Sequence, residues 1–558
     1  MGYPEYMNES LQMVEASRPR RVELSKQGLQ NILKPLSAEG RHKVLSENHP
    51  DYQPDARKSI RVGINRGESM TGQVVDVLES YSRLPQGFRL EPLDYETDVL
   101  VIGGGGAGCM AANWARKGGA KVIISTKLRL GDANSMMSQG GMQAAINPHD
   151  SPLFHYLDAM GGGHFDNKPE LMQVLTSEAP YIAKHLEELG VMWDRTPDGN
   201  LSTQAGGGGS RRRMLSARDY TGAEIMRVLR DEVRNFPEDI LLLEYFPAVE
   251  LLKDREGKVA GAVLFNMETG EYAVIKSKVV ILTTGGFGRL HIKDFPTTNH
   301  YGATMDGVVM AYRAGANLLH MDSVQFHPTG AIYPPQIFGF LITEKIRGMG
   351  GQPLNAKGEL FVFPLEPRDV EASEYIQECK KGMGVPTPDG KVGVWLDSPI
   401  VEILHGQGII ERAFPAMFRQ YRRFDIDIRK QPMLVYPTLH YQNGGVETDP
   451  NTHTNLPGLL VAGEVSGGVH GRNRLMGNSV LDYNVFGRRA GIEAARMAKE
   501  TSSPQGLNLE HVAGFESELK EAGVTRDRFA PILLPEYRNI SALEKHRQDF
   551  DPFLPAGL

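Results

Sequence analysis

The sequence predicts an α/β fold, and three apolar runs carry that prediction. Residues 97–102 form a short apolar run that fits a buried parallel strand, and glycines follow it at once. The stretch 109–116 is helix-like and ends at Gly118, after which residues 121–125 read as a second strand. Together these elements form a strand–helix–strand unit of about 30 residues. A third apolar run, 279–282, adds another buried strand.

Two further segments predict helices that would cover this sheet. Residues 169–189 have the apolar spacing of a long amphipathic helix. Thr221 and Glu224 have the spacing of a capping box, in which each side chain bonds the backbone amide of the other residue. The apolar stripe behind this box is formed by Ile225, Val228 and Leu229.

Composition excludes several classes of protein. The net charge is −7, so a strongly basic nucleic-acid-binding surface is not expected. Two cysteines, Cys109 and Cys379, rule out a disulfide scaffold and are too few for an iron–sulfur cluster, which takes about four ligands. No apolar run approaches the roughly 18 residues of a membrane span, and the N-terminus lacks an apolar signal core. We therefore expect a soluble, cytoplasmic protein without a nucleic-acid partner.

Glycine is over-represented, with 62 of 558 residues, or about 11 %, against a usual share of about 7 %. The glycines cluster at 103–108, 161–163 and 206–209. The first cluster satisfies G-x-G-x-x-G between a strand and a helix, where glycine permits a tight turn, close approach of a pyrophosphate and close helix packing. The helix N-terminus then favours the anion. This pattern predicts a Rossmann-like dinucleotide site, and the alternative is an ordinary glycine turn.

The end of the second strand argues against a plain NAD site. An acidic residue at that position usually holds the NAD ribose. The sequence has Ser125, Thr126 and Lys127 there instead. A different dinucleotide is therefore favoured.

Residues 1–95 stand apart from this unit. Prolines punctuate the stretch, and it contains no cluster of catalytic residue types. One segment is predicted to be helical, with Thr71 as its cap. The apolar face of that helix would be Val74, Val75, Leu78 and Tyr81. We expect an extension that packs either on its own domain or on a partner subunit.

A series of short motifs runs in order along residues 96–500. The motifs are 126–127, 138–141, 284–289, 306–307, 325–330, 343–348, 368–370, 437–441, 462–464, 470–475 and 478–482. Each is weak alone, but the ordered series resembles the flavoprotein subunits of succinate dehydrogenase and fumarate reductase, a superfamily that includes L-aspartate oxidase. The resemblance implies a Rossmann-like FAD-binding domain with an inserted α+β capping domain, plus an N-terminal extension and a short C-terminal helical tail.

The resemblance also implies domain limits. The FAD-binding domain would comprise residues 96–289 and 438–500, with the capping domain at 290–437. The extension would comprise residues 1–95 and the tail residues 501–558. Departures from the family pattern fall in the capping region, at Met305, Leu360 and Ser373 and in a shortened segment before Arg368. These departures would reshape the substrate site or a partner interface.

FAD is the implied cofactor, and no metal site is expected. The implied FAD-binding residues are Gly103, Gly105, Gly106, Ala107, Gly108, Thr126, Lys127, Ser138, Gln139, Gly140, Gly141, Asp306, Glu464, Ser479 and Val480. In the family a histidine often carries FAD covalently, and Asn134 occupies the matching position here. Because an amide cannot serve as that nucleophile, we predict non-covalent FAD.

A small dicarboxylate is the implied substrate, and its charges require charge-assisted donors. The matching residues are His327, Thr343, His440 and Arg474 for substrate binding, with Arg368 as proton shuttle and Glu344 and Arg347 as its relay to solvent. The implied activity is that of an oxidoreductase acting on CH–CH groups. It would interconvert fumarate, or a related unsaturated dicarboxylate, and succinate by hydride transfer at FAD N5.

Electrons would be exchanged with a separate iron–sulfur subunit, because two cysteines cannot hold the cluster. That subunit would belong to a soluble or membrane-associated electron-transfer complex. Two other functions stay open. An L-aspartate oxidase would form iminoaspartate, and the run Ser210-Arg211-Arg212-Arg213 resembles one in those enzymes, although it also fits a solvated basic edge. A non-catalytic scaffold subunit would not need the intact set of candidate catalytic residues.

Overall fold

The computed structural model describes residues 2–28, 33–290, 292 and 295–533. Its largest sheet has seven strands in the order β8-β4-β3-β11-β10-β9, with β19 also paired to β11. The strands β8, β4, β3, β11 and β19 are mutually parallel, and β9 and β10 form an antiparallel edge. The strands are β3 (Tyr95–Ile102), β4 (Val122–Thr126), β8 (Ile240–Glu244), β9 (Ala248–Lys253), β10 (Val259–Phe265), β11 (Tyr272–Leu282) and β19 (Leu459–Val461).

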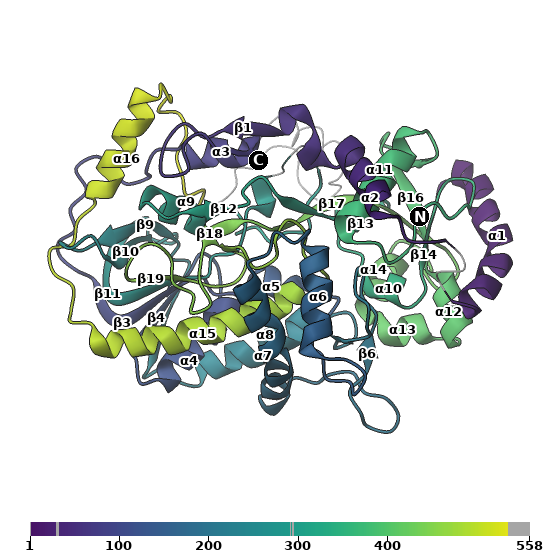
Figure 1. The fold of residues 1–558 in the computed structure, drawn as a ribbon, viewed down its shortest axis with the longest axis horizontal. Helices are drawn as coiled ribbons and strands as arrows, with labels where there is room; N and C mark the ends of the chain where they lie inside the picture. The colour runs from purple at the N-terminus through teal and green to yellow at the C-terminus, as the bar shows by residue number, and fades with distance from the viewer. Residues whose placement is uncertain (1, 29–32, 291, 293–294, 534–558) are drawn as a thin grey trace, which may run out of the picture.

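Helices cover both faces of this sheet, which confirms the α/β prediction (Figure 1). On one face lie α4 (Gly106–Lys117), α7 (Pro169–Glu188), α8 (Thr221–Arg234) and α15 (Asn478–Glu500). The other face packs against α3 (Gly72–Leu78), α9 (Asp306–Arg313) and α16 (Glu510–Glu521). All of β4, and β3 from Val99 to Ile102, is buried, as a parallel strand covered on both faces requires.

The predicted capping box at the start of α8 is wrong. Tyr220 is the N-cap residue, and Thr221 already lies inside the helix. Thr221 Oγ1 accepts a hydrogen bond from Ala217 N, while Glu224 accepts one from Met192 N. Both side chains thus bind neighbouring loops, which compete with the local cap that the spacing allows.

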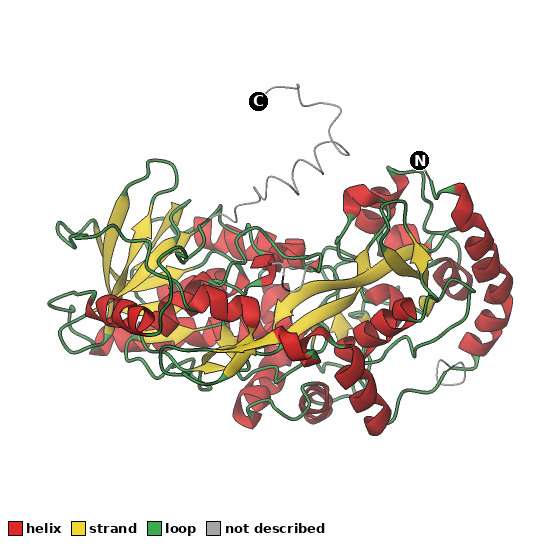
Figure 2. Cartoon of the chain, turned by 90° about the horizontal axis from the view of Figure 1, so that it is seen from above, coloured by secondary structure: helices red, strands yellow, loops and turns green. Residues whose placement is uncertain are grey.

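A second body is built on an antiparallel sheet in the order β13-β17-β16-β14, with β15 paired to β16. Figure 2 shows its long strands running from the middle of the molecule into the body on the right. The strands are β13 (Val324–Ala331), β14 (Gln352–Leu354), β15 (Val385–Pro386), β16 (Val392–Asp397) and β17 (Met433–Gln442). The helices are α10 (Lys345–Gly348), α11 (Arg368–Lys380), α12 (Pro399–His405), α13 (Ile409–Ala413) and α14 (Pro415–Arg422).

The N-terminal extension packs along both bodies of its own chain (Figure 1). Its first helix, α1 (Asn8–Lys26), lies against the second body beside α12, and α2 (Ala38–Asn48) packs on α11. The pair β1 (Arg57–Ser59) and β2 (Ser69–Thr71) leads into α3, whose apolar face is buried as predicted. Thr71 occupies the N-cap position of α3, but its side chain makes no capping hydrogen bond.

Short elements complete the described chain. They are α5 (Asn134–Met137), α6 (Pro152–Gly162), β5 (Met142–Gln143), β6 (Thr203–Gln204), β7 (Met214–Leu215), β12 (Leu318–Leu319), β18 (Gly445–Glu447) and β20 (Ser466–Gly467). The predicted C-terminal tail begins with α16, and its residues 534–558 lie outside the described residues. Among the described helices, none is long and apolar enough to cross a membrane.

Candidate functional site

A cavity of about 540 Å³ lies where the carboxyl ends of β3, β4 and β11 meet the strands β13 and β17. Ligands of open parallel sheets bind at this edge of the sheet. The glycine cluster lines one part of the cavity, and His327, His440, Arg368 and Arg474 line another. Of the residues predicted for cofactor and substrate, only Gly108 and Arg347 are not among the cavity-lining residues.

The glycine cluster has the backbone geometry that close approach requires. Gly103 has φ of +121°, and a Cβ there would lie 2.3 Å from the Thr283 carbonyl oxygen. A Cβ on Gly108 would lie 1.9 Å from the carbonyl oxygen of Gly103, so glycine is needed for α4 to meet β3. Because α4 begins at Gly106 on the cavity wall, its first N–H groups and its dipole face the cavity. This cradle fits the pyrophosphate of a dinucleotide.

Lys127 and Asp306, both predicted to contact the cofactor, form an ion pair on the cavity wall, with 2.5 Å between Nζ and Oδ2. Lys127 Nζ also donates to Thr304 Oγ1 at 2.7 Å and to the Ile532 carbonyl oxygen at 2.9 Å. Thr304 in turn donates to Asp306 at 2.7 Å. The C-terminal segment therefore helps to hold the lysine that follows β4.

Asn134 lies on the cavity wall in a fixed orientation. Its Nδ2 donates to Asn299 Oδ1 at 2.6 Å and to Glu464 Oε2 at 3.3 Å, while its Oδ1 accepts from His300 N at 2.7 Å. Burial raises the pKa of Glu464, against the hydrogen bonds from Gln442 N and Asn134. The amide thus has partners for both its donor and its acceptor.

His327 on β13 and His440 on β17 face each other across the antiparallel strand pair, with ring centroids 5.0 Å apart. Burial, with smaller contributions from Arg368 and other cations, holds the pKa of both well below the ordinary value. Both rings are therefore neutral at neutral pH. Thr329 N donates to His327 Nδ1 at 3.2 Å, so the proton of the neutral ring lies on Nε2, where it can be donated.

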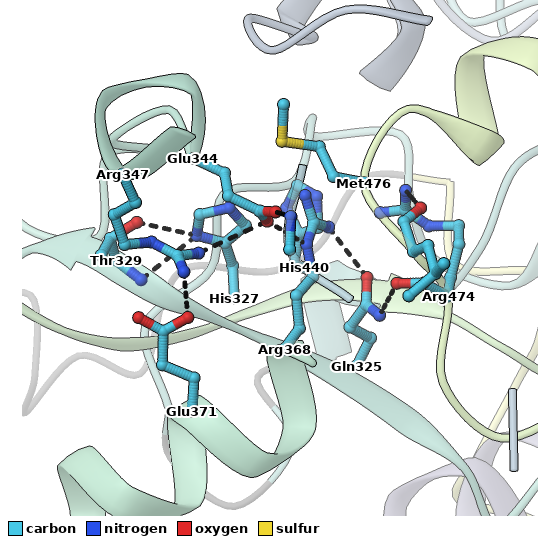
Figure 3. Close-up of polar contacts among 12 residues, drawn as sticks. Gln325, His327, Thr329, Glu344, Arg347, Arg368, Glu371, His440, Arg474 and Met476 are labelled. Atoms are coloured by element: carbon cyan, nitrogen blue, oxygen red, sulfur yellow. Dashed lines mark hydrogen bonds and ion pairs between the residues drawn. The ribbon is translucent and has the colours of Figure 1, made fainter. Parts of the chain in front are cut away.

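Arg368, the first residue of α11, is held by two side chains (Figure 3). Its Nε donates to Glu344 Oε2 at 2.8 Å and its Nη1 donates to Gln325 Oε1 at 2.9 Å. Burial lowers the pKa of Arg368, and Glu344 opposes that shift. Burial also favours the neutral form of Glu344, but Arg368 and Arg347 outweigh it and keep the carboxyl pKa below its ordinary value. The pair is therefore ionised.

Gly207, in the glycine cluster that the sequence left without a role, positions Glu344. Its backbone N–H donates to Glu344 Oε1 at 2.6 Å, and a Cβ at Gly207 would lie 2.7 Å from that oxygen. Sequence reasoning missed this contact. The only local signal is the density of glycine at 206–209, which indicates close approach without naming the neighbour.

Arg474 is buried and has donors to spare. Its guanidinium lies over the Tyr441 ring at 4.3 Å, and Nη1 donates to the Leu475 carbonyl oxygen at 3.2 Å. Within the described part of the chain, its Nε has no hydrogen-bond partner. Burial and the repulsion of Arg368 lower its pKa to about 9, so it is cationic at neutral pH. Two arginines against one directly paired carboxylate give this end of the cavity the character of an anion site.

Two predictions on arginines need correction. Arg347 does not line the cavity; it lies behind Glu344, bound to Glu371, and both side chains are fully buried. The predicted relay from Glu344 through Arg347 therefore ends on buried groups and does not reach solvent in this structure. In the run 210–213, Arg213 is buried in ion pairs with Asp150 and Asp158, which assigns it a structural role.

Comparison with known proteins agrees with this geometry. Residues 98–480 match a family model described as FAD binding domain. The fumarate reductase (CoM/CoB) flavoprotein relative from Methanothermobacter marburgensis is 40% identical over 418 residues, which are 73% of this chain and 74% of that protein. L-aspartate oxidase of Streptomyces coelicolor is 34% identical over 72% of this chain and 69% of its own length.

Solved structures give the same result. The structure of Mycobacterium smegmatis Sdh1 in complex with UQ1 is 37% identical, with a TM-score of 0.62, over 77% of this chain and 72% of that one. A quinol-fumarate reductase with menaquinol molecules is 30% identical, with a TM-score of 0.68, over 77% and 75%. The fold and its cradle thus define a flavin-dependent oxidoreductase. The chain belongs to the family of fumarate reductase and succinate dehydrogenase flavoproteins, which also includes L-aspartate oxidase.

Proposed function

We propose that this protein is the flavoprotein subunit of a fumarate reductase or succinate dehydrogenase type enzyme, acting on fumarate, or a related unsaturated dicarboxylate, and succinate. One observation carries the proposal. Arg474, the neutral His327 and His440, and the Arg368–Glu344 pair converge on one part of the cavity that the glycine cradle also lines. A dianion in that part of the cavity would meet two cations and two N–H donors.

FAD fits the cradle, and when bound it supplies the hydride equivalent for reduction of the double bond. Gly103–Gly108 would hold the pyrophosphate, and Glu464 and the start of α15 would complete the site. Binding would be non-covalent. Asn134 stands where the family often has the histidine nucleophile, and its amide is already bonded on both sides.

The chain's own residues bind and orient the substrate and move the proton. Arg474 and the two histidines would hold the carboxylates, because charge-assisted donors replace the water that a dianion loses on entry. That grip would polarise the alkene toward the transition state. Arg368 would donate a proton to the second alkene carbon, and Glu344 Oε2, 2.8 Å from its Nε, would return a proton to it. Succinate oxidation would use the same groups in reverse.

Electrons would pass to or from a separate iron–sulfur subunit of a larger complex. Among the described residues, no group of three or more His, Cys, Asp or Glu side chains could hold a metal ion. The two cysteines are single and free, and neither forms part of a cluster-binding set. Several relatives are named as subunits, which supports a partner chain.

L-aspartate oxidation is the second candidate, supported by the relative from Streptomyces coelicolor and by the non-covalent cofactor that Asn134 predicts. The two functions differ in a simple measurement. Hydrogen peroxide formed on adding L-aspartate under air would favour the oxidase. The run 210–213 supports the oxidase less than the sequence indicates, because Arg213 serves the fold.

The purified chain, loaded with FAD, is expected to oxidise a reduced viologen dye when fumarate is added. The dye replaces the electron-transfer partner, so the assay tests the chain alone. Succinate with an oxidised dye tests the reverse direction. If fumarate, substituted fumarates and succinate all leave the dye unchanged while FAD is bound, the proposal is wrong.

Acid precipitation of the holoprotein is expected to leave the flavin in the supernatant, because Asn134 offers no nucleophile. Absorbance of the supernatant and flavin fluorescence of the denatured band on a gel measure the split. A family member with covalent FAD serves as the control. Flavin that stays with the protein pellet would contradict non-covalent binding.

A further inference from the structure

Glu371 is a buried carboxylate that the proposed mechanism does not use. It lies on α11 one turn after Arg368, with no exposed surface. Its Oε2 forms an ion pair with Arg347 Nη1, and its Oε1 accepts from Tyr375 OH at 2.9 Å. Burial raises the pKa of Glu371, and Arg347 acts against that rise. Holding a carboxylate this deep in the protein costs stability unless its partners are well placed.

Four charges alternate along two short segments (Figure 3). Glu344 and Arg347 are three residues apart around the start of α10, and Arg368 and Glu371 are three residues apart at the start of α11. The resulting row is Arg368, Glu344, Arg347, Glu371. Glu344 is shared, because its Oε2 lies 2.8 Å from Arg368 Nε and 3.4 Å from Arg347 Nη2.

Arg347 is therefore a competitor for Glu344. Its Nη1 binds Glu371 and the Pro364 carbonyl oxygen, the latter at 2.8 Å. Within the described residues, its Nη2 and Nε make no hydrogen bond. Without the charge of Glu371, Arg347 would turn these donors to Glu344, the nearest remaining carboxylate, and Arg368 would lose part of its partner.

The geometry points to Glu371 as a positioning residue: by holding Arg347, it reserves Glu344 for Arg368. This inference rests on the proposed role of Arg368 as proton donor. Arg368 also faces His327 from β13, His440 from β17, and Arg474, and all three oppose or fail to stabilise its positive charge. Glu344 is thus the group that keeps Arg368 charged, and control of Glu344 is control of the proton donor.

Glu371→Gln keeps the shape of the side chain and removes its charge. In the fumarate assay we expect kcat to fall about tenfold, a size typical of residues coupled in one salt-bridge network, with KM unchanged. The alkaline limb of kcat should move to lower pH, because Arg368 loses part of the carboxylate that favours its charged form. Glu374→Gln, one turn further along α11 and without contact to Arg347, is the matched control and should behave as the wild type.

A crystal structure of the Glu371→Gln holoprotein provides a readout that does not depend on turnover. Arg347 Nη2 is expected to move from 3.4 Å to hydrogen-bonding distance of Glu344. In an Arg347→Met background, Glu371→Gln should have no further effect on kcat or on the pH profile. If Arg347 stays in place and the profile is unchanged, the positioning role is wrong. If the wild type itself fails to reduce any dicarboxylate, the proposed function is wrong, and the crystal structure still decides the positioning role.

Discussion

Replacing Arg368 by glutamine is expected to lower kcat for fumarate reduction by about 10²- to 10⁴-fold, the usual contribution of a positioned proton donor. The change removes the group that would protonate the alkene carbon and leaves Glu344 buried beside a neutral amide. Because Arg368 lies away from the glycine cradle, FAD content should stay at the wild-type level. Steady-state turnover with a reduced dye and the flavin absorbance of the purified variant measure the two quantities.

Arg368→Lys separates charge from the other properties of arginine. A buried lysine loses its proton more readily than arginine, since burial lowers the pKa of an ammonium group. We expect residual activity that disappears at lower pH than in the wild type. Arg211→Gln, at an exposed arginine outside the cavity, is the control and should change neither kcat nor the pH profile. Wild-type turnover in Arg368→Gln would remove Arg368 from the mechanism and revive the scaffold function.

Local rules predict the parts of the fold that local chemistry decides. The unit β3-α4-β4 follows from two apolar runs and a glycine cluster, because a missing Cβ is the only way for α4 to meet β3 at Gly103 and Gly108. The histidine pair is different. His327 and His440 lie far apart in sequence, and nothing in either segment says that β13 and β17 pair. Only the resemblance to known flavoproteins brought them together.

The errors of the sequence analysis have a common cause. Thr221 and Glu224 have the spacing of a cap, yet both bind loops that the sequence does not place beside them. Arg347 was expected to lead toward solvent, but the burial of Glu371 decides where it ends. Buried polar side chains bond whichever group the tertiary fold brings near, so their partners cannot be read from spacing.

The N-terminal extension shows the same limit from the other side. Its composition indicated packing on a surface, without saying which one. In the structure it crosses from the second body to the large sheet, and its ion pairs with Asp397 are buried. Trp395 Nε1 donates to Ser10 Oγ at 2.8 Å, so α1 is joined to β16 by side-chain contacts as well as by packing. The strand β16 in turn pairs with β17, which carries His440.

Asp397 is the residue on which that attachment depends most. Its carboxylate is fully buried at the end of β16 and accepts from Arg18 Nε and Nη2 at 3.0 Å each and from Arg21 Nη2 at 2.8 Å. Asp397→Ala is expected to lower the free energy of unfolding by about 3–5 kcal/mol, because it leaves two arginines buried without a counter-charge. Urea denaturation followed by tryptophan fluorescence measures the loss, since Trp395 reports on this contact.

The control and a rescue variant make the cause testable. Asp389→Ala removes a carboxylate from an ion pair with Lys391 that is partly exposed, and should cost no more than about 1 kcal/mol. Replacing Arg18, Arg21 and Asp397 together by apolar residues should recover most of the loss, because the penalty comes from unpaired charge and not from the missing bonds. Equal effects of Asp397→Ala and Asp389→Ala would show that α1 is held by its apolar contacts alone. Faster trypsin cleavage within α1, confined to Asp397→Ala, would locate the damage in the extension.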